Sequence, residues 1–159
     1  MRKLRIYLDT SVVNFVFADD APDFKRATID FFEDCANLYE LYVSDVVIGE
    51  IDRDPDLAHR RQLLSVLAEH GVILLPNEDI DEIRQLAQFY VEGGIVTQAK
   101  MADALHVAYA TVHEMDVLLS WNFRHLANLD KEARILAANA EQGYRYPLRL
   151  ASPLEVLYD

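Results

Sequence analysis

Short apolar runs and longer stretches with helical spacing alternate along this chain. Runs rich in leucine, β-branched and aromatic residues predict strands at residues 6–8, 41–43, 72–75, 116–120 and 148–150. Apolar residues at helical spacing predict helices at 12–17, 22–39, 46–51, 57–70, 78–92, 98–115 and 130–142, and a short one after Ser152. No linker, repeat or low-complexity tract interrupts this order. The pattern predicts one α/β domain over residues 1–159, with a parallel sheet of about four to five strands covered by helices.

Polar residues suited to helix ends support these assignments. Ser44 or Asp45, Asn77 and Thr97 each precede a helical pattern and are expected to be N-caps. The stretch 152–155 reads Ser-Pro-Leu-Glu, which is a capping box with proline at the first helical position. A short helix is therefore expected at the end of the chain.

Asp9 ends the first apolar run and is followed by two hydroxyl residues, Thr10 and Ser11. A buried strand that stops in this way emerges at an edge of its sheet. In a parallel sheet, ligands bind in the crevice outside the carboxyl ends of the strands. Asp9 is therefore the first candidate for a functional carboxylate, and the other candidates are residues that can meet it there.

Three further side chains are candidates to meet Asp9 at this edge. Glu50 lies about two turns into the helix after the second strand. Asp103 lies beyond the first turn of its expected helix, where a role as partner of the helix dipole is weakened. Asn122 follows the fourth strand. Asp116 does not qualify, because a strand that begins there places it more than about 10 Å from the strand's far end.

Composition narrows the class of protein. The net charge of −12 argues against bulk electrostatic attraction of nucleic acid, although cations held by carboxylates can reverse the field locally. The one cysteine, Cys35, cannot form an internal disulfide, and no apolar run is long enough to cross a membrane. We therefore expect a cytoplasmic protein with no membrane partner.

The motifs in combination resemble those of a PIN domain. They are Asp9-Thr-Ser after the first strand, an acid in the helix after the second, Asp103-Ala-Leu-His-Val-Ala in a late helix, and Ser-Trp-Asn at the end of the next strand. The resemblance covers nearly the whole chain and is closest to the stand-alone, toxin-type (VapC-like) ribonucleases. It implies a three-layer α/β/α fold, an Mg²⁺- or Mn²⁺-dependent endoribonuclease that cleaves RNA, a cognate antitoxin and a homodimer.

The same resemblance implies roles for individual residues. The family's acidic pocket maps onto Asp9, Glu50 and Asp103, as catalytic residues and metal ligands. The position of a frequent fourth acid maps onto Asn122, which is a departure from the family pattern. An amide oxygen can coordinate a metal but brings no charge. A second metal ion would therefore have one negatively charged ligand fewer than in the family pattern.

Electrostatics supports a cation in such a pocket independently of the resemblance. Three crowded carboxylates repel one another, and burial makes their ionisation harder still. A hard divalent cation removes this conflict, and magnesium favours a few carboxylates together with several waters. Because a bound cation can also acidify water and stabilise charge on a phosphodiester, hydrolysis is the expected reaction.

Five neighbouring residues are expected to assist. Thr10 and Ser11 are placed to orient a water or a carboxylate, although hydroxyls after a strand also satisfy turn backbone. Lys100, Arg124 and His125 lie next in sequence to the pocket elements and are candidates for holding RNA phosphate. The alternative for these three is ordinary surface charge.

Other interpretations stay open at this point. His106 and His113 are interpreted as helix-face residues, since no histidine-rich ligand spacing surrounds them. A phosphotransferase with a strand-one aspartate nucleophile usually has a second acid two residues later, where this chain has Ser11. The stronger alternative is a catalytically weak or inactive PIN-like binding module, because Asn122 departs from the four-acid pattern.

Overall fold

The structure is a computed structural model that describes residues 2–156. In this range the sheet has five strands: β1 (Arg5–Leu8), β2 (Glu40–Val43), β3 (Ile73–Leu74), β4 (Val117–Leu119) and β5 (Arg149–Ala151). Their order is β3-β2-β1-β4-β5, and every neighbouring pair is parallel. The sheet predicted from the apolar runs is confirmed.

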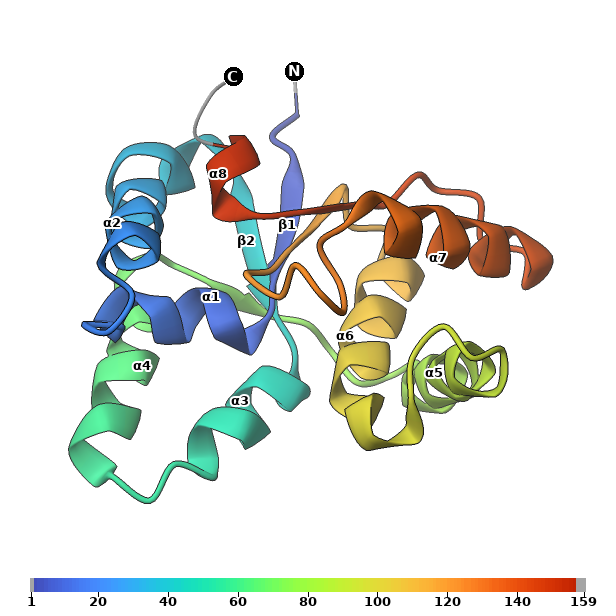
Figure 1. The fold of residues 1–159 in the computed structure, drawn as a ribbon, viewed down its shortest axis with the longest axis horizontal. Coiled ribbons are helices and arrows are strands. Elements are labelled where there is room, and N and C mark those ends of the chain that lie inside the picture. The colour runs from blue at the N-terminus through green and yellow to red at the C-terminus, as the bar shows by residue number, and fades with distance from the viewer. Residues whose placement is uncertain (1, 157–159) are drawn as a thin grey trace.

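Helices cover both faces of the sheet (Figure 1). They are α1 (Thr10–Asn14), α2 (Pro22–Asp30), α3 (Asp45–Asp52), α4 (Leu57–Glu69), α5 (Ile80–Glu92), α6 (Met101–Val112), α7 (Leu129–Glu141) and α8 (Pro153–Val156). Figure 1 shows α1, α2 and α4 on one side and α5, α6 and α7 on the other. This arrangement confirms the three-layer α/β/α fold. Among the described helices, none combines the length and apolar character that a membrane span requires.

The two central strands are buried on both faces. Tyr7 and Leu8 of β1, and Leu118 and Leu119 of β4, are fully buried. Strands of this kind read as continuous apolar runs, because helices cover both faces of a parallel sheet. The edge strand β3 is shorter than expected, and its side chains are exposed.

The strand order positions the site. From β1 the chain builds β2 and β3 on one side and then crosses to build β4 and β5 on the other. The connections that leave β1 and β4 diverge, and this topological switch point is where open α/β sheets bind ligands. Asp9 directly follows β1, and Ser120 directly follows β4.

Two expected helix caps are wrong. Helix α5 begins at Ile80, and the side chain of Asn77 instead accepts a hydrogen bond from the Tyr109 hydroxyl at 2.5 Å. Thr97 makes no side-chain cap bond and precedes a 3₁₀ turn, so α6 begins only at Met101. In the first case a tertiary partner replaces the local one, and in the second the short 3₁₀ turn delays the α-helix.

Other helix ends agree with the sequence, apart from one interruption. Ser44 is the N-cap of α3, and the Ser152 N–H donates to Glu155 Oε2 at 2.7 Å, as in a capping box. The single helix expected over 22–39 is interrupted, because α2 passes into a π-helical segment, Phe31–Cys35, and a 3₁₀ turn, Ala36–Leu38.

Candidate active site

A cleft of about 320 Å³ lies at the carboxyl edge of the sheet. Its lining brings together six residues that the sequence placed at the site and two that it did not place there: Asp9, Thr10, Ser11, Glu50, Asp103 and Asn122, together with Asn14 and His106. They come from α1 and the residue before it, from α3 and α6, and from the segment after β4. Residues distant in sequence therefore line one cleft.

Asp9 is the N-cap of α1 and is almost fully buried. Its Oδ1 accepts hydrogen bonds from the Ser11 hydroxyl at 2.5 Å and from the Val12 N–H at 3.3 Å. Burial raises the pKa of Asp9, although the nearby His106 and these hydrogen bonds oppose the rise. The fold thus holds the carboxyl in place while making its ionisation harder.

Glu50 enters the cleft from α3 with 31% of its side chain exposed. Its Oε1 lies 2.7 Å from the Thr10 hydroxyl, which donates to it, and 2.9 Å from His106 Nε2. Burial works to raise the pKa of Glu50, but the contacts with His106 and Thr10 outweigh it and the pKa is lowered. Glu50 is therefore the readily ionised acid of the cleft.

Asp103 lies in the first turn of α6, so the expected position beyond the first turn is wrong. Burial raises its pKa, and the charges of Asp9 and Glu50 raise it further, against the opposing influence of His106 and Lys100. The three carboxylates therefore interact electrostatically, as expected for acids around one cleft.

Asn122 both lines the cleft and holds the turn after β4. Its Oδ1 accepts a hydrogen bond from the His125 N–H at 3.0 Å, and its own N–H donates to the Ser120 hydroxyl at 2.9 Å. The Trp121 N–H donates to the Ser11 hydroxyl at 3.0 Å, which joins this turn to the segment after β1. The side-chain oxygen of Asn122, which could coordinate a metal, is therefore already engaged by a backbone N–H.

His106 is the main residue that the sequence interpretation missed. It was expected on an ordinary helix face, but its side chain is 2% exposed and touches Glu50 in the cleft. The available signal was its spacing from Asp103, because residues three apart on a helix share a face. Asn14 carried the same kind of signal, since it lies four residues after Thr10 in α1.

The expected phosphate-binding residues do not line the cleft. Lys100 is near enough to influence the pKa of Asp103 by its charge. Arg124 and His125 lie in the turn after β4, where the His125 backbone contacts Asn122. These three residues stand outside the group that lines the cleft.

The chemistry of the cleft suits a hard cation. Carboxylate, hydroxyl and amide oxygens line it, which are the ligand types that Mg²⁺ and Mn²⁺ prefer. Among residues 2–156, no three His, Cys, Asp or Glu side chains are gathered closely enough to hold a metal by themselves. Because magnesium is usually held by one or two carboxylates and several waters, the oxygen ligands fit a largely hydrated ion.

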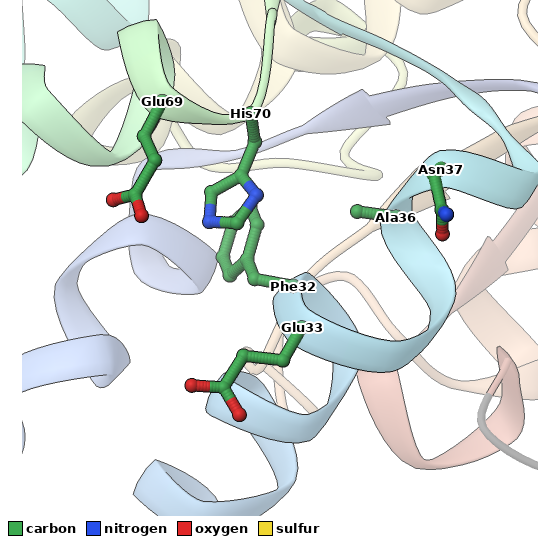
Figure 2. A pocket seen from close by; sticks show the side chains of 6 residues that line it. All are labelled: Phe32, Glu33, Ala36, Asn37, Glu69 and His70. Atoms are coloured by element: carbon green, nitrogen blue, oxygen red, sulfur yellow. The ribbon is translucent and has the colours of Figure 1, made fainter.

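A second cleft, of about 350 Å³, lies between the end of α4 and the π-helical segment (Figure 2). The rings of His70 and Phe32 contact each other there, with centroids 4.9 Å apart. In Figure 2 the side chains of Glu33 and Glu69 extend beside this pair of rings. Both carboxylates are exposed, so this cleft lacks the buried acids of the first.

Comparisons with known proteins agree with this fold. No curated protein matches the sequence. The structure is similar to a chain in the crystal structure of VapBC2 from Rickettsia felis bound to a DNA fragment from its promoter, with a TM-score of 0.60 and 15% identity, covering 94% of this chain and 98% of that one. At this identity the likeness shows the fold alone. The family model of the PIN domain matches residues 6–132, and the chain therefore belongs to the PIN domain family.

Proposed function

We propose that this protein is an endoribonuclease that uses Mg²⁺ or Mn²⁺ to hydrolyse RNA phosphodiester bonds. The observation that carries the proposal is the meeting of Asp9, Glu50 and Asp103 in one cleft at the switch point of a PIN fold. Two of these acids have raised pKa values, and the third is ionised readily. Such a group favours occupation by a cation over three free negative charges.

The residues of the cleft have different roles in this proposal. Asp9, Asp103 and Glu50 hold the cation, directly or through its waters. The cation supplies a Lewis acid that makes bound water more acidic and offsets charge on the phosphodiester. Ser11 keeps the Asp9 carboxylate in place through its hydrogen bond, and Thr10 does the same for Glu50. Asn122 shapes the rim through the turn that it stabilises.

The proposal extends to contacts with the substrate and to partners. Lys100, Arg124 and His125 are proposed to contact RNA phosphates beside the cleft, because a chain of net charge −12 needs local cations to approach a polyanion. A cognate antitoxin and a homodimer in the cytoplasm complete the proposal. The similar Rickettsia felis structure, a VapBC2 complex, supports the antitoxin.

A catalytically weak or inactive binding module is the second candidate. Asn122 favours it, because this residue stands where the family often has a fourth acid and its Oδ1 is already engaged by the His125 N–H. A module of this kind would bind nucleic acid or a partner without cleaving it. Cleavage and metal binding therefore separate the two candidates.

The decisive experiment offers structured and single-stranded RNA and DNA to the purified protein, with manganese or with chelator. We expect RNA cleavage only with the metal. Asp103→Asn should lower the rate at least about tenfold, equivalent to about 1.4 kcal/mol of transition-state stabilisation. Glu69→Gln, an exposed acid of the second cleft (Figure 2), is the matched control and should retain the wild-type rate. Cleavage that persists in chelator would contradict the mechanism, and metal binding without cleavage of any substrate would favour the binding module.

A further inference from the structure

A line of hydrogen bonds runs from the core to the cleft. The Ser44 and Tyr7 hydroxyl oxygens lie 2.7 Å apart, and the Tyr7 oxygen lies 2.6 Å from His106 Nδ1. His106 Nε2 then lies 2.9 Å from Glu50 Oε1. Ser44, Tyr7 and His106 are buried, whereas Glu50 opens to the cleft. The line therefore ends on one oxygen of a proposed metal ligand.

The direction of these hydrogen bonds follows from the partners. A carboxylate can only accept, so His106 Nε2 carries a hydrogen and donates it to Glu50. In a neutral imidazole Nδ1 is then an acceptor, and the Tyr7 hydroxyl donates to it. The Ser44 hydroxyl donates to Tyr7 and accepts the Val46 N–H. With this assignment, every hydroxyl hydrogen in the line has an acceptor.

We propose that His106, fixed in its Nε2–H form by Tyr7 and Ser44, is a positioning residue that holds Glu50 in the geometry needed to bind the cation. This inference rests on the proposed metal-dependent function of the cleft. In this role His106 acts through its hydrogen bond to Glu50 and takes no direct part in the reaction.

The geometry at Glu50 explains why a positioning residue is useful there. A glutamate side chain has several rotatable bonds and loses considerable rotamer freedom when it is fixed. His106 and Thr10 both donate to Oε1, and in the described residues Oε2 accepts no hydrogen bond from the protein. One oxygen is therefore anchored while the other stays available to a cation or its waters. Partners of this kind commonly change metal affinity or activity by about 10- to 100-fold when they are removed.

Tyr7 suits its place in the line. Burial raises the pKa of its phenol well above the ordinary value, so the hydroxyl keeps its hydrogen over the whole physiological range. It is therefore a constant donor to His106 Nδ1. Removing this hydroxyl should release the constraint on which imidazole nitrogen carries the hydrogen, without touching Glu50 directly.

The first test is spectroscopic and does not depend on catalysis. Nitrogen-15 NMR of the metal-free protein should show His106 with hydrogen on Nε2 and none on Nδ1. Tyr7→Phe should increase the population with hydrogen on Nδ1. A wild-type protein that carries its hydrogen on Nδ1 would overturn the proposal, because Nε2 could not then donate to Glu50.

The second test measures manganese affinity by calorimetry and cleavage by kcat and KM. His106→Phe should weaken manganese binding or lower kcat by about tenfold with little change in KM for RNA, and His106→Gln should restore part of the loss through its amide donor. In a Glu50→Gln background, His106→Phe should have a much smaller effect, because the two residues act as one unit. His70→Gln, in the second cleft, is the matched control (Figure 2).

The outcomes separate this inference from the proposed function. A wild-type protein that neither binds manganese nor cleaves RNA would refute the metal-dependent function and, with it, the role of His106. A wild-type protein that does both, with His106→Phe folded and unimpaired, would refute the positioning role alone. Full additivity of the His106 and Glu50 substitutions would also refute it, because the two effects would then be independent.

Discussion

The backbone N–H of Asp9 donates a hydrogen bond to the carbonyl oxygen of Leu119 at 3.1 Å. This contact continues the parallel pairing in which Leu8 is the register partner of Leu119. It places the residue after β1 beside the end of β4, so the segments that follow both strands must meet. This backbone hydrogen bond therefore brings Asp9 close to the turn that contains Asn122.

We expect the buried carboxyl of Asp9 to destabilise the metal-free fold at neutral pH. Burial raises its pKa, so as the pH rises the unfolded chain releases this proton before the folded protein does. Between about pH 4, near the unfolded pKa, and the raised folded pKa, the contribution of Asp9 to the free energy of unfolding therefore falls. Asp9→Asn keeps an oxygen acceptor for Ser11 and Val12 and should raise the melting temperature in chelator at pH 7.

A pH series of melting curves checks the sign of this effect. The advantage of Asp9→Asn should be greatest at neutral pH and should vanish below about pH 4, where the wild-type carboxyl is protonated in both the folded and the unfolded state. A stabilisation that does not depend on pH would show that ionisation of Asp9 is not its cause.

Manganese should reverse this ranking. Because the proposed site exists only in the folded protein, manganese should raise the wild-type melting temperature by mass action, and a concentration of 100 times Kd corresponds to about 2.7 kcal/mol. Asp9→Asn should lose most of the shift, and Glu69→Gln should keep it. Differential scanning fluorimetry over a manganese series measures both variants. An equal shift in Asp9→Asn would place the ion elsewhere.

The sequence anticipated the layers and most of the cleft because both depend on patterns visible in local sequence. The buried strands β1 and β4 read as apolar runs, and the carboxyl edge of a parallel sheet is a general ligand site. What it missed depends on contacts between distant segments. Asn77 binds Tyr109 rather than capping α5, and His106 faces Tyr7 and Glu50.

Gly49 is another position where the local sequence does not predict the packing. Gly49 stands beside Glu50 inside α3, where a glycine costs about 1 kcal/mol relative to alanine and can indicate close approach of another backbone. In the structure no heavy atom outside the local helix lies within 4 Å of a Cβ built at Gly49. No other part of the described protein therefore approaches Gly49 closely, and packing within the chain does not explain a glycine at this position.

One buried hydrogen bond connects α2 to the turn after β4. The Trp121 indole N–H donates to the hydroxyl of Thr28 at 2.8 Å, and Thr28 is fully buried. Thr28→Val keeps the shape but leaves this N–H unpaired, so it should lower the free energy of unfolding by about 1–3 kcal/mol. Urea denaturation of the single and double variants measures the coupling. In a Trp121→Phe background the same substitution should cost much less, and equal costs in both backgrounds would show that the bond contributes nothing.

Asn122 is where this chain departs from the four-acid pattern, and Asn122→Asp tests that position. An aspartate Oδ1 can still accept the His125 N–H, so the turn should persist while the cleft gains a negative charge. Divalent binding should become stronger, by analogy with sites whose affinity is tuned by ligand charge. The metal-free protein should become less stable at neutral pH, because a fourth carboxylate joins a group that already repels.

The expected effect of Asn122→Asp on the cleavage rate differs from its effect on metal binding. A more tightly held cation stabilises ground state and transition state alike unless the new charge acts only in the transition state, and uniform binding does not raise kcat. We therefore expect tighter manganese binding without a proportional gain in kcat. Calorimetry of manganese binding, paired with melting curves in chelator, measures both halves for the wild type and the variant. If manganese affinity and metal-free stability are both unchanged, the side chain at position 122 does not share the electrostatic field of Asp9, Glu50 and Asp103.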